Sequence, residues 1–89
     1  MMEIKVLGPG CANCKRLYGE AEKAVKYLGM AVTLTKVETI EEIRTYKIFM
    51  TPALVINGEV KAAGRIPDAT QIMTWLTTAA MQDMREEPN

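Results

Sequence analysis

Residues 8–16 of this chain read Gly-Pro-Gly-Cys-Ala-Asn-Cys-Lys-Arg, and this segment holds both cysteines of the protein, Cys11 and Cys14. Before it, residues 4–7 alternate and are rich in branched side chains, which is typical of a short β-strand that the glycines and the proline then end. After it, apolar residues recur at helical spacing and predict an amphipathic helix over about 11–28. We therefore expect the two cysteines at a strand-to-helix junction.

The start of a helix favours a thiolate at Cys11. Unpaired N–H groups and the positive end of the helix dipole point there. Lys15 and Arg16 add positive charge one turn along, so we expect a lowered pKa for Cys11. Cys14 heads the apolar face of the helix and should be the more buried thiol. This arrangement predicts that Cys11 attacks a disulfide and that Cys14 resolves the mixed disulfide. Asn13 either donates a hydrogen bond to the thiolate or favours the helix start.

The Cys-x-x-Cys spacing alone leaves three interpretations open. It occurs in redox-active pairs, it supplies half of a zinc site, and two such cysteines can also be buried and inert. The glycine-rich turn and the helix start favour the redox pair.

The composition indicates one domain without net charge. The 89 residues are too few for two hydrophobic cores, and 48% of them are apolar. Eleven basic and eleven acidic residues cancel, so no field attracts nucleic acid or an anionic membrane. Because the chain has no histidine, Cys–His dyads and mixed Cys/His metal sites are excluded.

The sequence also predicts a location. No stretch is long and apolar enough to cross a bilayer, and the first residues lack the pattern of a secretion signal. We therefore expect a cytoplasmic protein without a membrane partner. In that compartment, two nearby cysteines are more often catalytic or metal-binding than structural.

The segments after the first helix predict a second strand and a second helix. Gly29 is placed to end the first helix in the left-handed conformation. Residues 32–37 favour a strand, which the intervening helix should make parallel to the first. Thr39 and Glu42 have the spacing of a capping box and predict a short helix over about 40–46.

The second half of the chain predicts two further strands and a last helix. Residues 53–56 form a continuous apolar run that suits a central strand. The Asn-Gly pair at 57–58 is a strong hairpin signal, so residues 59–63 should return antiparallel at the edge of the sheet. Asp68, with a glutamine three residues later, caps a last helix that reaches about residue 80. The expected order is βαβαββα.

These motifs resemble those of a known family, and they occur in its order. The Cys-x-x-Cys pair at a helix start, the Thr-Pro pair at 51–52 before a core strand, the Asn-Gly hairpin and Gly64 after the edge strand resemble a minimal thioredoxin fold of glutaredoxin length. The likeness covers about residues 2–78 and is nearest to the small thioredoxin-like redox-active disulfide proteins of archaea and anaerobic bacteria. It implies an α/β fold whose four-stranded mixed sheet is flanked by three helices.

The resemblance also implies roles for individual residues. It implies that Cys11 is the exposed nucleophile of a Cys11–Cys14 redox disulfide and that Cys14 is the resolving thiol. It further implies a cis bond between Thr51 and Pro52, although only about 5–6% of X–Pro bonds are cis and the sequence alone makes Pro52 a helix stop. The backbone of Thr51 would pair with an extended substrate segment beside Pro52, and Gly10 would belong to the same substrate-binding surface.

Two departures from the relatives bear on tuning and partners. Ala-Asn stands between the cysteines where thioredoxins carry Gly-Pro and glutaredoxins Pro-Tyr, and Asn13 and Lys15 are expected to modulate the thiolate. Where glutaredoxins hold glutathione with a Gly-Gly followed by acidic residues, this chain keeps only Gly64, and Asp68 is explained as a helix cap. We therefore expect a thioredoxin-reductase-like partner rather than glutathione.

Several apolar residues are candidates for contacts outside the core. Met50, just before the Thr-Pro pair, is a candidate for lining an apolar substrate groove. Trp75, Met81 and Met84 are expected to pack inward, with a dimer contact as the alternative. Lys5, on the first strand, is expected to be a solvated residue.

A soft-metal binding protein is the alternative function. Copper chaperones also place Cys-x-x-Cys between a first strand and a first helix, and two thiolates suit Cu(I) or zinc. Those chaperones follow a βαββαβ order and lack the Thr-Pro pair. We therefore predict a monomeric thiol–disulfide oxidoreductase of electron transport that acts on protein disulfides without a bound cofactor. Its thioredoxin-like domain spans 1–80, and a helix end and polar tail follow over 81–89.

Overall fold

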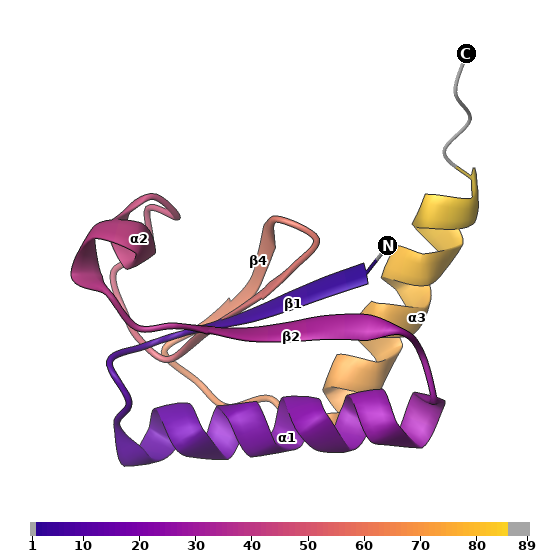
Figure 1. Cartoon of the computed structure of the whole chain (residues 1–89), viewed down its shortest axis with the longest axis horizontal. Helices are drawn as coiled ribbons and strands as arrows, with labels where there is room; N and C mark the ends of the chain where they lie inside the picture. Colours follow the sequence, from indigo (N-terminus) through magenta and orange to yellow (C-terminus); the bar gives the residue numbers. More distant parts are fainter. Residues whose placement is uncertain (1, 86–89) are drawn as a thin grey trace.

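The structure of the protein is a computed structural model that describes residues 2–85. Its elements follow the order βαβαββα, as the sequence predicts, and Figure 1 shows their arrangement. Their bounds are β1 (Met2–Leu7), α1 (Ala12–Leu28), β2 (Val32–Val37), α2 (Ile40–Arg44), β3 (Ala53–Ile56), β4 (Glu59–Ala63) and α3 (Ala69–Arg85).

The four strands form one mixed sheet in the order β2-β1-β3-β4. Strand β1 pairs parallel with β2 and antiparallel with β3, and β3 pairs antiparallel with β4. All four residues of β3 are buried, as expected for a central strand, whereas β4 lies at the edge. The predicted topology is confirmed, and it places the end of β1 in the middle of the sheet.

Alternate side chains of the central strands enter two hydrophobic clusters on opposite faces of the sheet, because successive residues of a strand point to opposite sides. The larger cluster joins β1 and β3 to α1 and α3, and the smaller one lies under α2. Figure 1 shows α1 and α2 on opposite sides of the sheet. The larger cluster contains Ile4, Val6, Leu17, Leu54, Ile72 and Leu76, and the smaller one contains Leu7, Val37, Ile43, Ala53 and Val55.

The ends of the long helices follow the sequence signals. Gly29 ends α1 in the left-handed conformation with φ 63°. Asp68 Oδ1 accepts a hydrogen bond from the Gln71 N–H at 2.9 Å, which is the predicted cap of α3. Glu20 of α1 adds a second contact there, because its Oε1 accepts a bond from the Ala69 N–H at 2.8 Å. The pKa of Glu20 is lowered, mainly by the hydrogen bond that it accepts from Lys23 and to a smaller extent by the one that it accepts from the Ala69 N–H.

The predicted capping box at the start of α2 is wrong. The Thr39 backbone carbonyl accepts the first helical bond, from the Ile43 N–H at 3.0 Å, but the Thr39 side chain makes no capping hydrogen bond. The helix also ends at Arg44, before the predicted end at Tyr46. From Thr45 onward, backbone N–H groups bond to carbonyls three residues earlier, so the chain tightens out of the α-helical pattern.

The last helix continues to Arg85, past the helix end predicted at about residue 80. The division of the chain into a domain over 1–80 and a helix end with a polar tail over 81–89 stays a prediction. Trp75 packs against the larger cluster, as expected. The inward packing predicted for Met81 is wrong, since this side chain is 54% exposed. The alternative, a dimer contact, stays a prediction. The buried face of α3 follows Ile72, Leu76 and Ala79, and Met81 lies off it. The side chain of Met84 and residues 86–89, where the polar tail was predicted, lie outside the described part of the chain.

Candidate active-site disulfide

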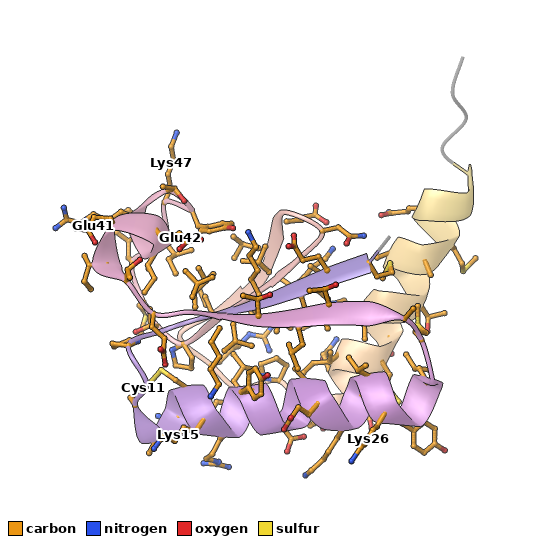
Figure 2. The ribbon with its side chains drawn as sticks, in the orientation of Figure 1. Cys11, Lys15, Lys26, Glu41, Glu42 and Lys47 are labelled. Carbon is orange, nitrogen blue, oxygen red and sulfur yellow. A yellow bond between two sulfur atoms is a disulfide. The ribbon has the colours of Figure 1, made fainter. Side chains whose placement is uncertain are left out.

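Cys11 and Cys14 form a disulfide at the first turn of α1. Cys11 is the N-cap residue of the helix and is exposed, whereas Cys14 is 5% exposed. Figure 2 shows Cys11 at the end of α1 that lies toward α2, with Lys15 on the next turn. The structure thus brings both predicted cysteines together and confirms that Cys14 is the more buried one.

The helix start supplies a hydrogen bond to the exposed sulfur. Cys11 Sγ accepts the backbone N–H of Cys14 at 3.2 Å, in the place where an N-cap side chain usually accepts. The Cys11 carbonyl in turn accepts the Lys15 N–H at 3.0 Å. Asn13 is exposed, and within the described residues the hydrogen bond to Cys11 Sγ comes from the Cys14 backbone rather than from the Asn13 side chain. The Cys14 N–H and the positive end of the helix dipole would stabilise negative charge on Cys11 Sγ.

Gly8 lies between the buried cysteine and the Thr-Pro segment. A Cβ placed on Gly8 would overlap Cys14 Sγ, and it would lie 3.3 Å from Cys14 Cβ and 3.8 Å from Pro52 Cα. The Thr51–Pro52 peptide bond is cis, and Pro52 is buried while Thr51 is exposed. Because Gly8 has no side chain, Cys14 and Pro52 can both pack against its backbone. Pro52 therefore lies close to the disulfide.

Met50 is held beside the end of the edge strand. It is 60% exposed, and a Cβ placed on Gly64 would lie only 2.9 Å from Met50 Cβ. Gly64 has φ 77°, a conformation that favours glycine, and its N–H donates to the Pro52 carbonyl at 2.9 Å. The neighbouring Phe49 is fully exposed. Sequence reasoning named Met50 but missed Phe49, although its place before a Thr-Pro pair was a usable signal.

A small cavity of about 30 Å³ is lined by Cys14 and by charged residues of α1 and of the β2 end. Lys36 opposes Val6 in the parallel pair of β1 and β2, and its Nζ lies 4.7 Å from the centroid of the Tyr18 ring. Glu38 reaches back toward the cysteine turn, since a Cβ placed on Gly10 would lie 3.4 Å from Glu38 Oε2. The residues around the cavity include Gly10, Cys14, Lys15, Tyr18, Lys36 and Glu38. Sequence reasoning did not single out Lys36 or Glu38.

Comparison with known proteins identifies the family. A family model described as a thioredoxin domain matches residues 2–77. This chain belongs to the thioredoxin family. It is 36% identical over 72 residues to a thioredoxin of Methanothermobacter thermautotrophicus, across 81% of this chain and 94% of that protein. A thioredoxin of Methanocaldococcus jannaschii is 32% identical over 72 residues, which cover 81% and 83% of the two chains.

Solved structures agree with this thioredoxin assignment at the level of the fold. The chain superposes on a thioredoxin-2 described as a component of malaria parasite protein secretion machinery with a TM-score of 0.69 and 18% identity, covering 88% of this chain and 82% of that one. The oxidised thioredoxin of Plasmodium falciparum gives a TM-score of 0.58 and 18% identity, covering 84% and 80%. At these identities the comparison concerns the fold alone.

The family and the disulfide together make this thioredoxin-family protein a thiol–disulfide oxidoreductase. Thioredoxin-family proteins exchange such a disulfide with protein disulfides and are themselves reduced by a reductase. In the described part of the chain, no three acidic or cysteine side chains form a group that could hold a metal ion. Across residues 2–85, none of the helices combines the length and the apolar character needed to cross a membrane.

In this thioredoxin-family protein, Lys5 lies on the face of the sheet opposite to α1. It is half-buried rather than the solvated residue that was expected, and its Nζ donates to the Tyr46 hydroxyl at 3.1 Å. That hydrogen bond is the main reason that the pKa of Lys5 is raised. Lys5 therefore ties the segment after α2 to β1 and lies on the face away from the cavity beside Cys14.

Proposed function

We propose that Cys11 is the nucleophile of this oxidoreductase and that Cys14 is its resolving thiol. The observation that carries this assignment is the difference in exposure between the two sulfurs at one helix start. An incoming protein disulfide reaches the exposed Cys11, whose sulfur already accepts a backbone N–H. Cys14, held below it, then attacks the mixed disulfide from within the protein.

The surface around Cys11 binds the substrate in this proposal. Gly10 leaves room beside the attacking sulfur, and the buried Pro52 shapes the floor of the surface. The backbone of the exposed Thr51 pairs with an extended segment of the substrate. Lys15, one turn along α1, adds positive charge near the thiolate. Asn13 lies in the first turn of α1, between the two cysteines, and modulates the thiolate. Met50 and Phe49 extend this surface with apolar side chains that remain exposed in the free protein.

The partners and the setting follow from the same proposal. The substrates are protein disulfides, and the reductant is a thioredoxin-reductase-like protein rather than glutathione, since the chain has one glycine at Gly64 where the glutaredoxin pattern has two. The protein acts as a monomer in the cytoplasm, where a reducing pool keeps dithiols available. The reaction uses no bound cofactor, because the two thiols themselves carry the electron pair.

Met50→Ala is expected to slow the reduction of a protein disulfide without slowing attack on a small one. Losing the apolar contact with a bound substrate costs about 1 kcal/mol, which is about fivefold in kcat/KM. The measurement is the reduction of insulin by dithiothreitol with the protein in catalytic amount, compared with its reaction with 5,5′-dithiobis(2-nitrobenzoate).

Met81→Ala provides the matched control, because Met81 is similarly exposed at 54% but lies on α3. Equal insulin reduction by Met50→Ala and the unmodified protein would remove Met50 from the substrate surface. Failure of the unmodified protein to accelerate insulin reduction at all would contradict the proposed protein substrates.

A further inference from the structure

The two edges of the sheet differ in how well they are protected against pairing with another strand. At the β4 edge, the register with β3 shifts by one residue at Lys61, and Lys61 forms an ion pair with Glu59 at 2.6 Å. A bulge and charged side chains are devices by which proteins prevent edge-to-edge pairing. Strand β2, at the other edge, pairs with β1 in unbroken register over six residues, and Lys36 is its only charged residue. Within residues 2–85, no strand covers its outer side.

The outward backbone groups of this edge belong to Val32, Leu34 and Lys36. The carbonyl of Val37 accepts the Gly8 N–H at 2.9 Å, so Val37 turns its backbone groups toward β1. The N–H and C=O groups of one strand residue point to the same edge, and successive residues alternate between the two edges. Every second residue of β2, counted from Val32, therefore directs its N–H and C=O groups away from β1, where an added strand can bond to them.

An open groove lies along the same edge, between β2 and α1. Leu34 opposes Ile4 in the register of β2 with β1, and Ile4 lies in the cluster under α1, so Leu34 faces this helix. A Cβ placed on Gly19 of α1 meets nothing within 4 Å, which leaves space for an incoming side chain. The volume is about 480 Å³, within the range of about 300–1,000 Å³ that is typical of ligand sites. This β2 groove is lined by Leu34 together with Gly19, Glu22, Lys23, Val25 and Lys26 of α1.

The charges along the β2 groove indicate which segment fits it. Two lysines and a single carboxylate, that of Glu22, line the groove. At one end stands Lys36, which faces α1 with its Nζ 4.7 Å from the centroid of the Tyr18 ring. Lys26 stands toward the other end, eight residues or about 12 Å further along α1, and Figure 2 shows it far from Cys11. Charge complementarity therefore favours a segment with an apolar residue between two carboxylates on one face.

We propose that the β2 edge binds an extended segment of a partner protein, which joins the sheet as a fifth strand. The segment bonds to the outward backbone groups of β2. On the face toward α1, it places an apolar side chain beside Leu34 in the β2 groove and carboxylates beside Lys26 and Lys36. This binding does not depend on which cysteine attacks.

The place of this edge in the fold gives the binding a consequence. Val37 ends β2 and bonds to Gly8, which packs on Cys14, so a strand added to β2 extends toward the disulfide. A partner held at the edge therefore stays close to Cys11 while its own disulfide is exchanged. Such a second contact raises the effective concentration of the partner at the site without changing the chemistry.

The test uses the peptide acetyl-Thr-Glu-Thr-Leu-Thr-Glu-Thr-amide, which places a leucine between two glutamates on one face of a strand. Amide hydrogen exchange of the oxidised protein is measured by NMR with and without millimolar peptide. Without peptide, the N–H groups of Leu34 and Lys36 should exchange faster than that of Thr35, which points toward β1. The peptide is expected to slow exchange at Leu34 and Lys36 by about tenfold, because these groups then exchange only when the added strand opens. Exchange at Lys61, on the β4 edge, should not change.

Modified peptides and one pair of variants separate strand addition from other binding. The same peptide with every backbone N–H methylated keeps its side chains but cannot pair with β2, so it should give no protection. A peptide with lysines in place of the glutamates should bind more weakly. Lys26→Gln should raise the Kd about two- to fivefold, the effect of losing one exposed ion pair. Lys61→Gln is the matched control on the other edge of the sheet and should leave the Kd unchanged.

Three results would overturn the proposal. Unchanged exchange at Leu34 and Lys36 with millimolar peptide would exclude strand addition at this edge. Equal protection by the methylated peptide would show that backbone pairing is not involved. Protection without peptide that rises with protein concentration, together with a doubled mass in sedimentation, would show that a second copy of the chain occupies the edge instead. None of these results changes the roles proposed for the two cysteines.

Discussion

Cys11→Ser is expected to abolish disulfide exchange, whereas Cys14→Ser is expected to retain attack and to accumulate mixed disulfides. A serine hydroxyl is not an effective nucleophile toward a disulfide sulfur, so the exposed position then carries no attacking group. In Cys14→Ser the exposed thiol remains, and its sulfur keeps the backbone N–H donor at position 14. The trapped adduct persists because no second thiol stands beneath it.

This prediction is checked by incubating each reduced variant with insulin and measuring intact masses under non-reducing conditions. The expected result is an adduct with Cys14→Ser that dithiothreitol removes, and none with Cys11→Ser. The double variant, which lacks both thiols, is the control for non-covalent association. If Cys11→Ser forms the stable adduct and Cys14→Ser does not, the two roles are reversed.

Gly8→Ala is expected to destabilise the protein by about 1–3 kcal/mol, the usual cost of forcing extra volume into a packed site. The new methyl group would overlap Cys14 Sγ and lie 3.3 Å from Cys14 Cβ. Gly8 is buried and its N–H donates to the Val37 carbonyl at 2.9 Å, so the backbone cannot move away without losing that bond. The attack by Cys14 should slow as well, because the methyl group displaces its sulfur.

Gly19→Ala is the matched control for this substitution. Gly19 lies inside α1, and a Cβ placed there meets nothing within 4 Å. Alanine should therefore stabilise the helix by about 0.5–1 kcal/mol. Urea unfolding compares the stability of the two variants directly. The release of the second thionitrobenzoate when each reduced variant reacts with 5,5′-dithiobis(2-nitrobenzoate) compares their rates of attack by Cys14. Equal stability of Gly8→Ala and the unmodified protein, with an unchanged rate of attack by Cys14, would contradict the close packing of Gly8 on Cys14.

The sequence predicts this fold well because most of its boundaries rest on local signals. Gly29 ends α1, the Asn-Gly pair forms the turn between β3 and β4, and Asp68 caps α3. Each of these signals determines the structure only of residues that are near it in the sequence. The alternation in β1 and the apolar run of β3 likewise predict which strands are buried. The bounds predicted for β2, β3 and β4 match the structure.

The sequence predicts the site less completely because its remaining parts depend on long-range contacts. The importance of Gly8 comes from Cys14 and Pro52, and Glu38 approaches Gly10 only when the end of β2 folds beside the cysteine turn. The end of α2 was predicted too late because the tightened turns after Arg44 carry no strong stop signal. Pattern and spacing describe neighbours along the chain, whereas these contacts join segments that are distant in sequence.

The central claim is that Cys11 and Cys14 form a reversible two-electron couple. The most direct test equilibrates the metal-free protein in buffers of oxidised and reduced dithiothreitol and counts its free thiols by alkylation and mass. We expect a single transition between no free thiols and two, with a midpoint that defines whether the protein is poised as a reductant. Two thiols that stay free under oxidising buffer while the isolated protein carries stoichiometric metal would contradict the account and favour metal handling.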